Sequence, residues 1–188
     1  MDNQDSLAKR GRTLEDEFFH RVDQKLAEEI RAKMAAENER KQLEQTCGLR
    51  DTALLEAIVA LGIGVETMVG LSLVPLVQVA WADGVIDRRE RDAVLKAADT
   101  SDCPVGSAAY QLLDHWLAEK PPASLFEAWK YYISALKGSM PPENWDKLRD
   151  EIVSHTRKVA TAAGGILGIG SISKQEDAVF AEVKSAFE

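Results

Sequence analysis

Helix signals follow one another along almost the whole chain, and no segment shows the alternation of apolar and polar residues that marks a strand. Residues that favour helices, chiefly Ala, Leu, Glu, Lys and Arg, fill the stretches between breaks that contain Gly or Pro. The sequence therefore predicts an all-α fold, a helical bundle of about seven to eight helices. The expected helices cover residues 13–45, 51–61, 65–82, 87–99, 107–119, 123–136, 143–163 and 173–187.

The first expected helix is long and mostly polar, and Thr13 can cap its start. Its apolar residues fall at a spacing near 3.6 and form one narrow stripe, but few of them follow Ile30. We therefore expect two parts, a long charged N-terminal helix at residues 1–46 and a helical domain at residues 51–188. The stripe consists of Leu14, Phe18, Val22 and Leu26, with Phe19 and Ile30 beside it.

The charge is acidic overall and unevenly placed. Lys and Arg number 23 against 31 Asp and Glu, which gives a net charge of −8. Residues 1–50 hold 11 acids and 10 bases, so the excess of acid belongs to the later part of the chain, with 20 acids and 13 bases. Proteins that bind nucleic acid take their affinity mainly from basic contacts to phosphate. The composition therefore argues against nucleic acid as a partner.

The cysteines and the first residues bear on the compartment. Cys47 and Cys103 have no CxxC spacing, so neither a zinc knuckle nor a disulfide framework is indicated. Residues 1–19 contain no apolar core of the kind found in signal peptides. We expect a reducing, cytoplasmic environment.

Two uncharged runs are too short to cross a membrane. Residues 67–82 run for 16 residues without a charge but include Pro75, and a spanning helix needs ~20 apolar residues. Residues 159–173 are rich in Gly and Ala, and Gly164 and Gly168 have the spacing used for close helix contact. We expect packed helices at both places and no membrane association.

A short motif, Gly-x-Ile-cap-x-x-Glu, occurs twice at an offset of 86 residues. Its copies run from Gly84 to Glu90 and from Gly170 to Glu176, with Asp87 and Ser173 as the residues expected to cap the following helices. The Glu three residues after each cap completes a capping box. Each copy lies between an apolar helix and an amphipathic helix. The sequence therefore predicts two related helix-turn-helix units.

The first copy carries an additional acid that a helix cap does not need. Asp83 precedes the glycine, and its counterpart in the second copy is Ile169. With Asp87 and Glu90 it makes three carboxylates around one turn, and such hard oxygen ligands suit Ca²⁺ or Mg²⁺. Two interpretations remain open at this point. Asp83, Asp87 and Glu90 form a divalent-cation site, or they belong to a structural turn with a solvated acidic rim.

Residues 79–90, VAWADGVIDRRE, and their degenerate echo from Gly170 to Glu176 resemble the TerB-like domain associated with bacterial tellurite resistance and stress response. The resemblance covers roughly residues 51–188. It implies an all-helical fold, no established enzymatic activity, and divalent-cation binding by acidic residues around this turn. The second copy departs from the acidic pattern at Ile169 and Ser173. The residues that match the pattern by position are Asp83, Asp87 and Glu90.

No residue pattern indicates an enzyme. The Gly-rich stretch at residues 164–171 lacks the Gly-Lys-Ser/Thr ending of a phosphate-binding loop, and no nucleophile is placed with a base. We therefore expect a non-enzymatic TerB-like module that acts in stress response and binds a divalent cation. The alternative is a protein-interaction adaptor without metal. In that alternative the N-terminal helix pairs with a protein partner or with a second copy through Leu14, Phe18, Val22 and Leu26.

Overall fold

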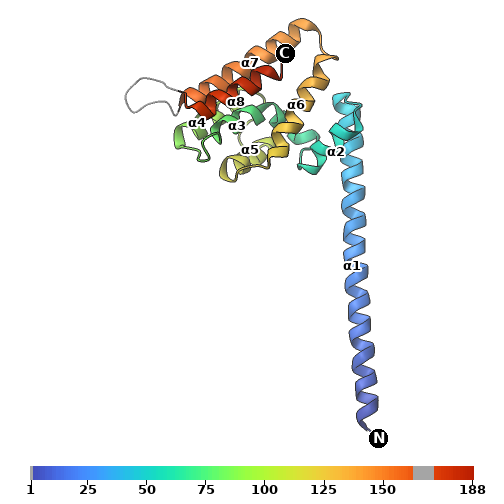
Figure 1. Ribbon diagram of the computed structural model, residues 1–188. Coiled ribbons are helices and arrows are strands. Elements are labelled where there is room, and N and C mark those ends of the chain that lie inside the picture. The colour runs from blue at the N-terminus through green and yellow to red at the C-terminus, as the bar shows by residue number, and fades with distance from the viewer. Residues whose placement is uncertain (1, 163–171) are drawn as a thin grey trace.

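The computed structural model describes the backbone of residues 2–162 and 172–188, and the side chains of Arg21 and of residues 24–162 and 172–188. Within this part of the chain there are eight α-helices, one 3-10 helix and no strand, so the all-α prediction is confirmed (Figure 1). In chain order the elements are α1 Asp2–Cys47, α2 Thr52–Ala60, η1 Val65–Leu73, α3 Val74–Ala80, α4 Arg88–Thr100, α5 Ala108–Ala118, α6 Ala123–Lys137, α7 Pro142–Ala162 and α8 Lys174–Ser185.

Side-chain caps begin several of these helices. Asp51 precedes α2 and its carboxylate accepts a hydrogen bond from the Leu54 N–H at 3.0 Å. Ser107 precedes α5 and its hydroxyl accepts from the Tyr110 N–H at 3.1 Å. Such caps satisfy backbone donors that the first turn of a helix leaves without a partner. The starts of α2 and α5 therefore lie where the sequence predicted them.

The apolar run expected as one helix at residues 65–82 is two elements instead. Residues 65–73 form η1, and α3 begins at Val74, with Pro75 in its first turn. Proline has no N–H and cannot donate a hydrogen bond to a preceding turn, but the first turn of a helix does not require that bond. Pro75 therefore lies at the start of a new helix and does not bend a longer one. The prediction of a single helix at residues 65–82 was wrong.

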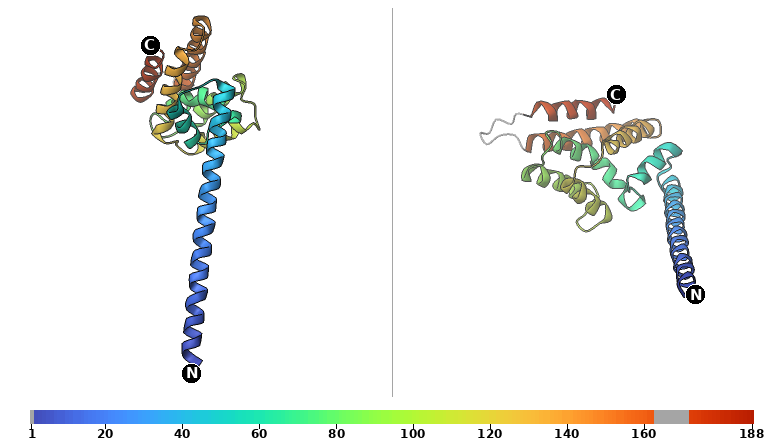
Figure 2. Two further views of the ribbon diagram at one scale, coloured as in Figure 1. Left: turned by 90° about the vertical axis from the view of Figure 1, so that its right-hand side faces the viewer. Right: turned by 60° about the horizontal axis from the view of Figure 1, so that its bottom comes forward.

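Helix α1 is longer than predicted and leaves the bundle as a projecting rod (Figures 1 and 2). It begins at Asp2, so Thr13 lies inside the helix and does not cap it. Only its C-terminal end packs on the bundle, against α2 and η1. There Leu43 is fully buried in the hydrophobic core. The last turns of α1 therefore belong to the folded core, whereas the rest of the helix extends away from it.

The bundle is built around α3, which contacts η1 and every helix from α4 to α8. All residues of α3 except Gln78 are buried, as expected for the most apolar helix of the chain. Helix α7 packs on α3, α4 and α8, and α2 packs on α6. Both predicted helix-turn-helix units therefore pack on the short helix α3, because α4 and α8 each contact it.

Aromatic side chains join the C-terminal end of the chain to α6 and α7. The ring of Trp129 stacks on Phe126 at 5.3 Å between centroids and meets the edge of Phe187 at 6.0 Å. Trp145 lies 5.3 Å from the same Phe187 ring. Aromatic pairs at these distances add stabilisation beyond their buried area. They fix the end of α8 against the bundle.

Among the described residues, no single helix has both the length and the apolar character needed to cross a membrane. One pair of helical segments, Thr52–Ala60 and Val65–Ala80, meets the length and composition criteria together but is bent by 89°.

Candidate functional site

The two predicted capping boxes are both formed. The Asp87 carboxylate accepts from the Glu90 N–H at 2.8 Å, and the Glu90 carboxylate accepts from the Asp87 N–H at 2.8 Å. In the second copy, Ser173 accepts from the Glu176 N–H at 3.1 Å, and Glu176 accepts from the Ser173 N–H at 2.6 Å. Two backbone donors are thereby satisfied at the start of α4 and at the start of α8.

Asp83 also has a local structural role. Its carboxylate accepts a hydrogen bond from the Val85 N–H at 3.0 Å, which bridges the turn around Gly84. Gly84 has a φ of 93°, a left-handed conformation that glycine adopts without steric cost. The interpretation as a structural turn therefore explains why an acid stands at position 83, which helix capping alone did not explain. Its sequence counterpart, Ile169, lies outside the described residues, as do Gly164, Gly168 and Gly170.

The two capping glutamates, Glu90 and Glu176, are buried, whereas Asp83 and Asp87 are exposed. Glu90 is 3% exposed and Glu176 is 6% exposed, and they are two of the three buried polar residues among those described. A capping glutamate usually lies at the surface, because glutamate is rarely buried without a charged partner. Burial of both copies is thus a feature of this fold and not a requirement of capping.

One oxygen of Glu176 has no hydrogen-bond partner among the described residues. Its Oε2 atom bonds the Ser173 N–H, but its Oε1 atom is buried and unpaired. An unpaired buried polar atom costs free energy, and a charged one costs more. This oxygen is therefore a buried acceptor that the capping box leaves without a partner.

The surroundings of the Glu90 carboxyl group favour its uncharged form more than water does. Burial raises the pKa of Glu90 to about 7, and the negative charges of Asp87, Glu176 and Asp83 add to this rise. The hydrogen bond from the Asp87 N–H acts in the opposite direction. Glu176, which is 86 residues further along the chain, is therefore close enough to Glu90 for its charge to affect this pKa. Figure 1 shows the first turns of α4 and α8 at the same end of the bundle.

The three acids predicted as a metal site are close enough for their charges to interact, but they are not arranged as a cage. Among the described side chains, no group of three or more His, Cys, Asp or Glu is placed to hold a metal ion. Asp83, Asp87 and Glu90 each direct one oxygen to a backbone N–H of the turn. Sequence reasoning did not include Glu176 in the site, although the repeated motif already marked it as the equivalent of Glu90.

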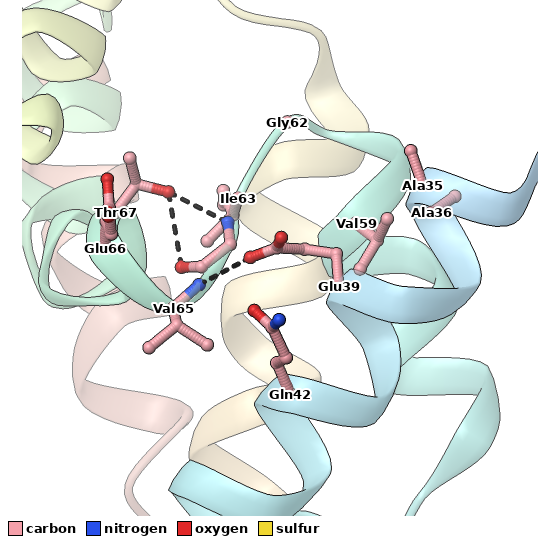
Figure 3. A pocket seen from close by; sticks show the side chains of 11 residues that line it. Ala35, Ala36, Glu39, Gln42, Val59, Gly62, Ile63, Val65, Glu66 and Thr67 are labelled. Atoms are coloured by element: carbon pink, nitrogen blue, oxygen red, sulfur yellow. Dashed lines mark hydrogen bonds between the residues drawn. The ribbon is translucent and has the colours of Figure 1, made fainter. Parts of the chain in front are cut away.

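A concave region away from these acids lies at the junction of α1 and η1, where an open groove of about 630 Å³ is found (Figure 3). Inside it the Glu39 carboxylate accepts from the Val65 N–H at 2.9 Å, at the N-terminal end of η1. The Thr67 hydroxyl accepts from the Gly64 N–H at 2.9 Å. A helix N-terminus attracts anions, and here the chain supplies its own in Glu39. The groove is therefore a junction that anchors α1.

Comparison of the chain with family models, with curated proteins and with solved structures finds no match. The TerB-like resemblance consequently stays a prediction that rests on the residues of the two motifs.

Proposed function

We propose that the chain is a non-enzymatic, TerB-like helical module of the bacterial stress or tellurite response that binds Ca²⁺ or Mg²⁺ between its two capping boxes. The observation that carries the proposal is the buried, unpaired Oε1 atom of Glu176 in a cluster that includes the buried Glu90. The resemblance of residues 79–90 to the TerB-like domain supports the same function. It is also the source of the stress-response assignment.

The electrostatics of the cluster favour a cation. Four carboxyl groups contribute to it, two of them buried, and after burial itself the negative charges of the other three raise the pKa of Glu90. A divalent cation would replace this repulsion by attraction and would satisfy oxygens that have no donor. A bound divalent ion would bring to these carboxyl groups a positive charge that none of the causes of the Glu90 pKa shift supplies.

The capping bonds leave oxygen atoms available for such an ion. In each box the glutamate bonds its cap residue through Oε2, so its second oxygen takes no part in the box. Asp83 and Asp87 are exposed and use only Oδ1. In this proposal one of these aspartates supplies a third ligand, and water completes the coordination that Ca²⁺ and Mg²⁺ accept.

Calorimetric titration of chelator-treated protein with Ca²⁺ and Mg²⁺ tests this proposal, with thermal melts in parallel. We expect one of the ions to bind and to raise the melting temperature, because a ligand that binds only the folded state stabilises it. Glu176→Gln and Asp83→Asn should each reduce that rise. Glu182→Gln is the matched control, since Glu182 is an exposed glutamate of the same helix α8. Absence of heat and of any rise with both ions would reject the cation site.

A second candidate function, the adaptor without metal, is favoured by a different observation. Leu26, Ile30 and Met34 on the projecting part of α1 are 53%, 49% and 67% exposed. Exposed apolar residues that lie in a row mark surfaces for protein partners. Leu14, Phe18 and Val22 of the predicted stripe lie on α1 as well, but their side chains are outside the described residues. The ion titration separates the two candidates, because the adaptor requires no ion.

A further inference from the structure

A groove of about 450 Å³ lies where α4 packs on α7. Its size is within the range of about 300–1,000 Å³ that is usual for small-molecule sites. Ala93 and Ala97 of α4 lie one helical turn apart, and their small side chains leave room between the longer side chains beside them. These longer side chains are Lys96 and Thr100 of α4 and Glu151, His155 and Lys158 of α7.

The basic side chains of this surface gather at one end of it. A smaller groove of about 240 Å³ adjoins the first and shares with it Thr100, Glu151 and His155. Lys96 and Lys158 line only the larger groove, whereas Asp102 lines only the smaller one. The larger groove is therefore bordered by three basic side chains and one acidic side chain, in a chain whose net charge is −8.

The pKa of His155 shows which charge prevails inside the larger groove. The side chain of His155 is half-buried, and burial is the main cause that lowers its pKa. The positive charge of Lys158 lowers this pKa further, and the negative charge of Glu151 raises it by less. The electric field at the imidazole ring is therefore dominated by Lys158, which favours an anion beside the ring.

The two lysines are not neutralised by the protein itself. Lys96 and Lys158 form no ion pair with any described side chain. Arg88 and Arg91 on α4 and Arg149 on α7 each pair with a carboxylate of the chain. Basic residues of the same two helices thus differ, and those that border the groove keep their charge for a ligand.

The number and kind of these groups indicate the chemistry of that ligand. A phosphoryl group offers three oxygen acceptors and carries close to two negative charges at pH 7, whereas a carboxylate carries one. Lysine binds phosphate as a point charge, and imidazole can donate an N–H in either protonation state. The methyl groups of Ala93 and Ala97 can contact the carbon atoms of a phosphate ester.

We propose that the groove between α4 and α7 binds the phosphoryl group of a small molecule, held by Lys96, His155 and Lys158. Inorganic phosphate and small phosphate monoesters share this group. The inference goes beyond the proposed function and uses none of the four carboxyl groups of the cation site.

NMR titration of the full, ¹⁵N-labelled chain with inorganic phosphate, and separately with phenyl phosphate, tests the proposal. The titrations contain no divalent cation, and sodium chloride of equal ionic strength is the reference. We expect the amide signals of Ala97, Thr100 and His155 to shift until the site is saturated. Tighter binding of phenyl phosphate would identify the ligand as a monoester, and equal binding would identify it as phosphate itself.

Lys96→Gln and Lys158→Gln should each weaken binding by at least about fivefold, because each removes one charge-assisted hydrogen bond. Lys147→Gln is the matched control, since Lys147 is an exposed lysine of α7 that lines neither groove. It should bind like the wild type. The same spectra show whether each variant is folded.

Three results would overturn the inference. They are the absence of saturable shifts with both compounds, unchanged affinity in Lys96→Gln and Lys158→Gln, and equal weakening in Lys147→Gln, which indicates only general attraction to positive charge. The Ca²⁺ and Mg²⁺ titrations contain no phosphate. The failure of each proposal is therefore visible separately.

Discussion

Glu90 and Glu176 hold the same position in two copies of one motif, are both buried, and lie near enough for the charge of Glu176 to raise the pKa of Glu90. Each also closes the first turn of its helix. The packing of α4 and α8 on α3 thus places two carboxyl groups with the same capping role where their negative charges repel each other. This repulsion adds to the effect of burial on the pKa of Glu90, and its consequence can be measured in the absence of any ion.

The first prediction concerns pH. The pKa of Glu90 is raised from 4.5 to about 7 in the folded protein, so between these values the folded state binds more protons than the unfolded state. The stability that protonation provides is complete below the lower value and is lost as the pH rises through about 7. Glu90→Gln keeps a neutral side chain at every pH. We expect its free energy of unfolding, relative to the wild type, to increase between about pH 5 and pH 8.

Urea denaturation of both proteins in the presence of chelator gives this difference directly. Glu182→Gln serves as the control for the loss of one carboxyl group, because Glu182 is an exposed glutamate of α8. A difference for Glu90→Gln that does not change over this range would mean that Glu90 ionises as it does in the unfolded chain.

The second prediction distinguishes the capping hydrogen bond of Asp87 from the negative charge of its side chain. Asp87→Ser copies the residue of the second motif and should cost less than about 0.5 kcal/mol, because serine caps nearly as well as aspartate. Asp87→Ala removes the acceptor for the Glu90 N–H and should cost about 1 kcal/mol. The free energies of unfolding of the two variants should therefore differ clearly. Asp99→Ala, at an exposed position in the last turn of the same helix, should cause no loss. Equal losses for Ser and Ala would argue against the cap.

The third prediction concerns where the folded domain begins. A chain that starts at Met34 keeps Glu39 and the buried Leu43, whereas a chain that starts at Cys47 loses both. We expect both to fold, but the shorter one to melt at a lower temperature, because loss of a buried leucine alone costs about 2–5 kcal/mol. Thermal melts followed by circular dichroism compare the two. Identical melting temperatures would place all of α1 outside the core.

The fourth prediction tests the anchor of α1. A side chain at Gly64 would collide with the Glu39 carboxylate, so Gly64→Ala should displace Glu39 from the Val65 N–H. The backbone at Gly64 has a negative φ that alanine tolerates, so the loss should come from this hydrogen bond, about 1 kcal/mol. In a Glu39→Ala background the same substitution should cost much less. Equal costs in both backgrounds, measured by urea denaturation, would show that Glu39 does not anchor the helix.

Local signals were predicted well from the sequence. A capping box depends on two residues three positions apart, so Asp87 with Glu90 and Ser173 with Glu176 could be recognised without knowledge of the fold. The sequence could not show that both glutamates are buried, because burial depends on how α4 and α8 pack on α3 and α7. For the same reason the effect of the Glu176 charge on the pKa of Glu90 was not predicted from the sequence.

Two errors in the expected helices have a shared cause. The segment at residues 65–73 is a 3-10 helix, which differs from an α-helix by one position in its hydrogen bonds and leaves a similar apolar pattern in the sequence. At Thr13 a capping residue lies inside α1, because a cap forms only where the backbone before it is not helical. In both cases the residues allow two backbone conformations, and the surrounding chain decides between them.

The continuity of α1 from Asp2 to Cys47 has a mechanical consequence. A helix of 46 residues measures about 70 Å, and no break separates its projecting segment from the turns that are buried beside α2. The hydrogen bond of Glu39 to Val65 and the burial of Leu43 restrain rotation at the point where α1 enters the bundle. The length of this continuous helix therefore sets how far from Glu90 and Glu176 anything bound near its far end would lie.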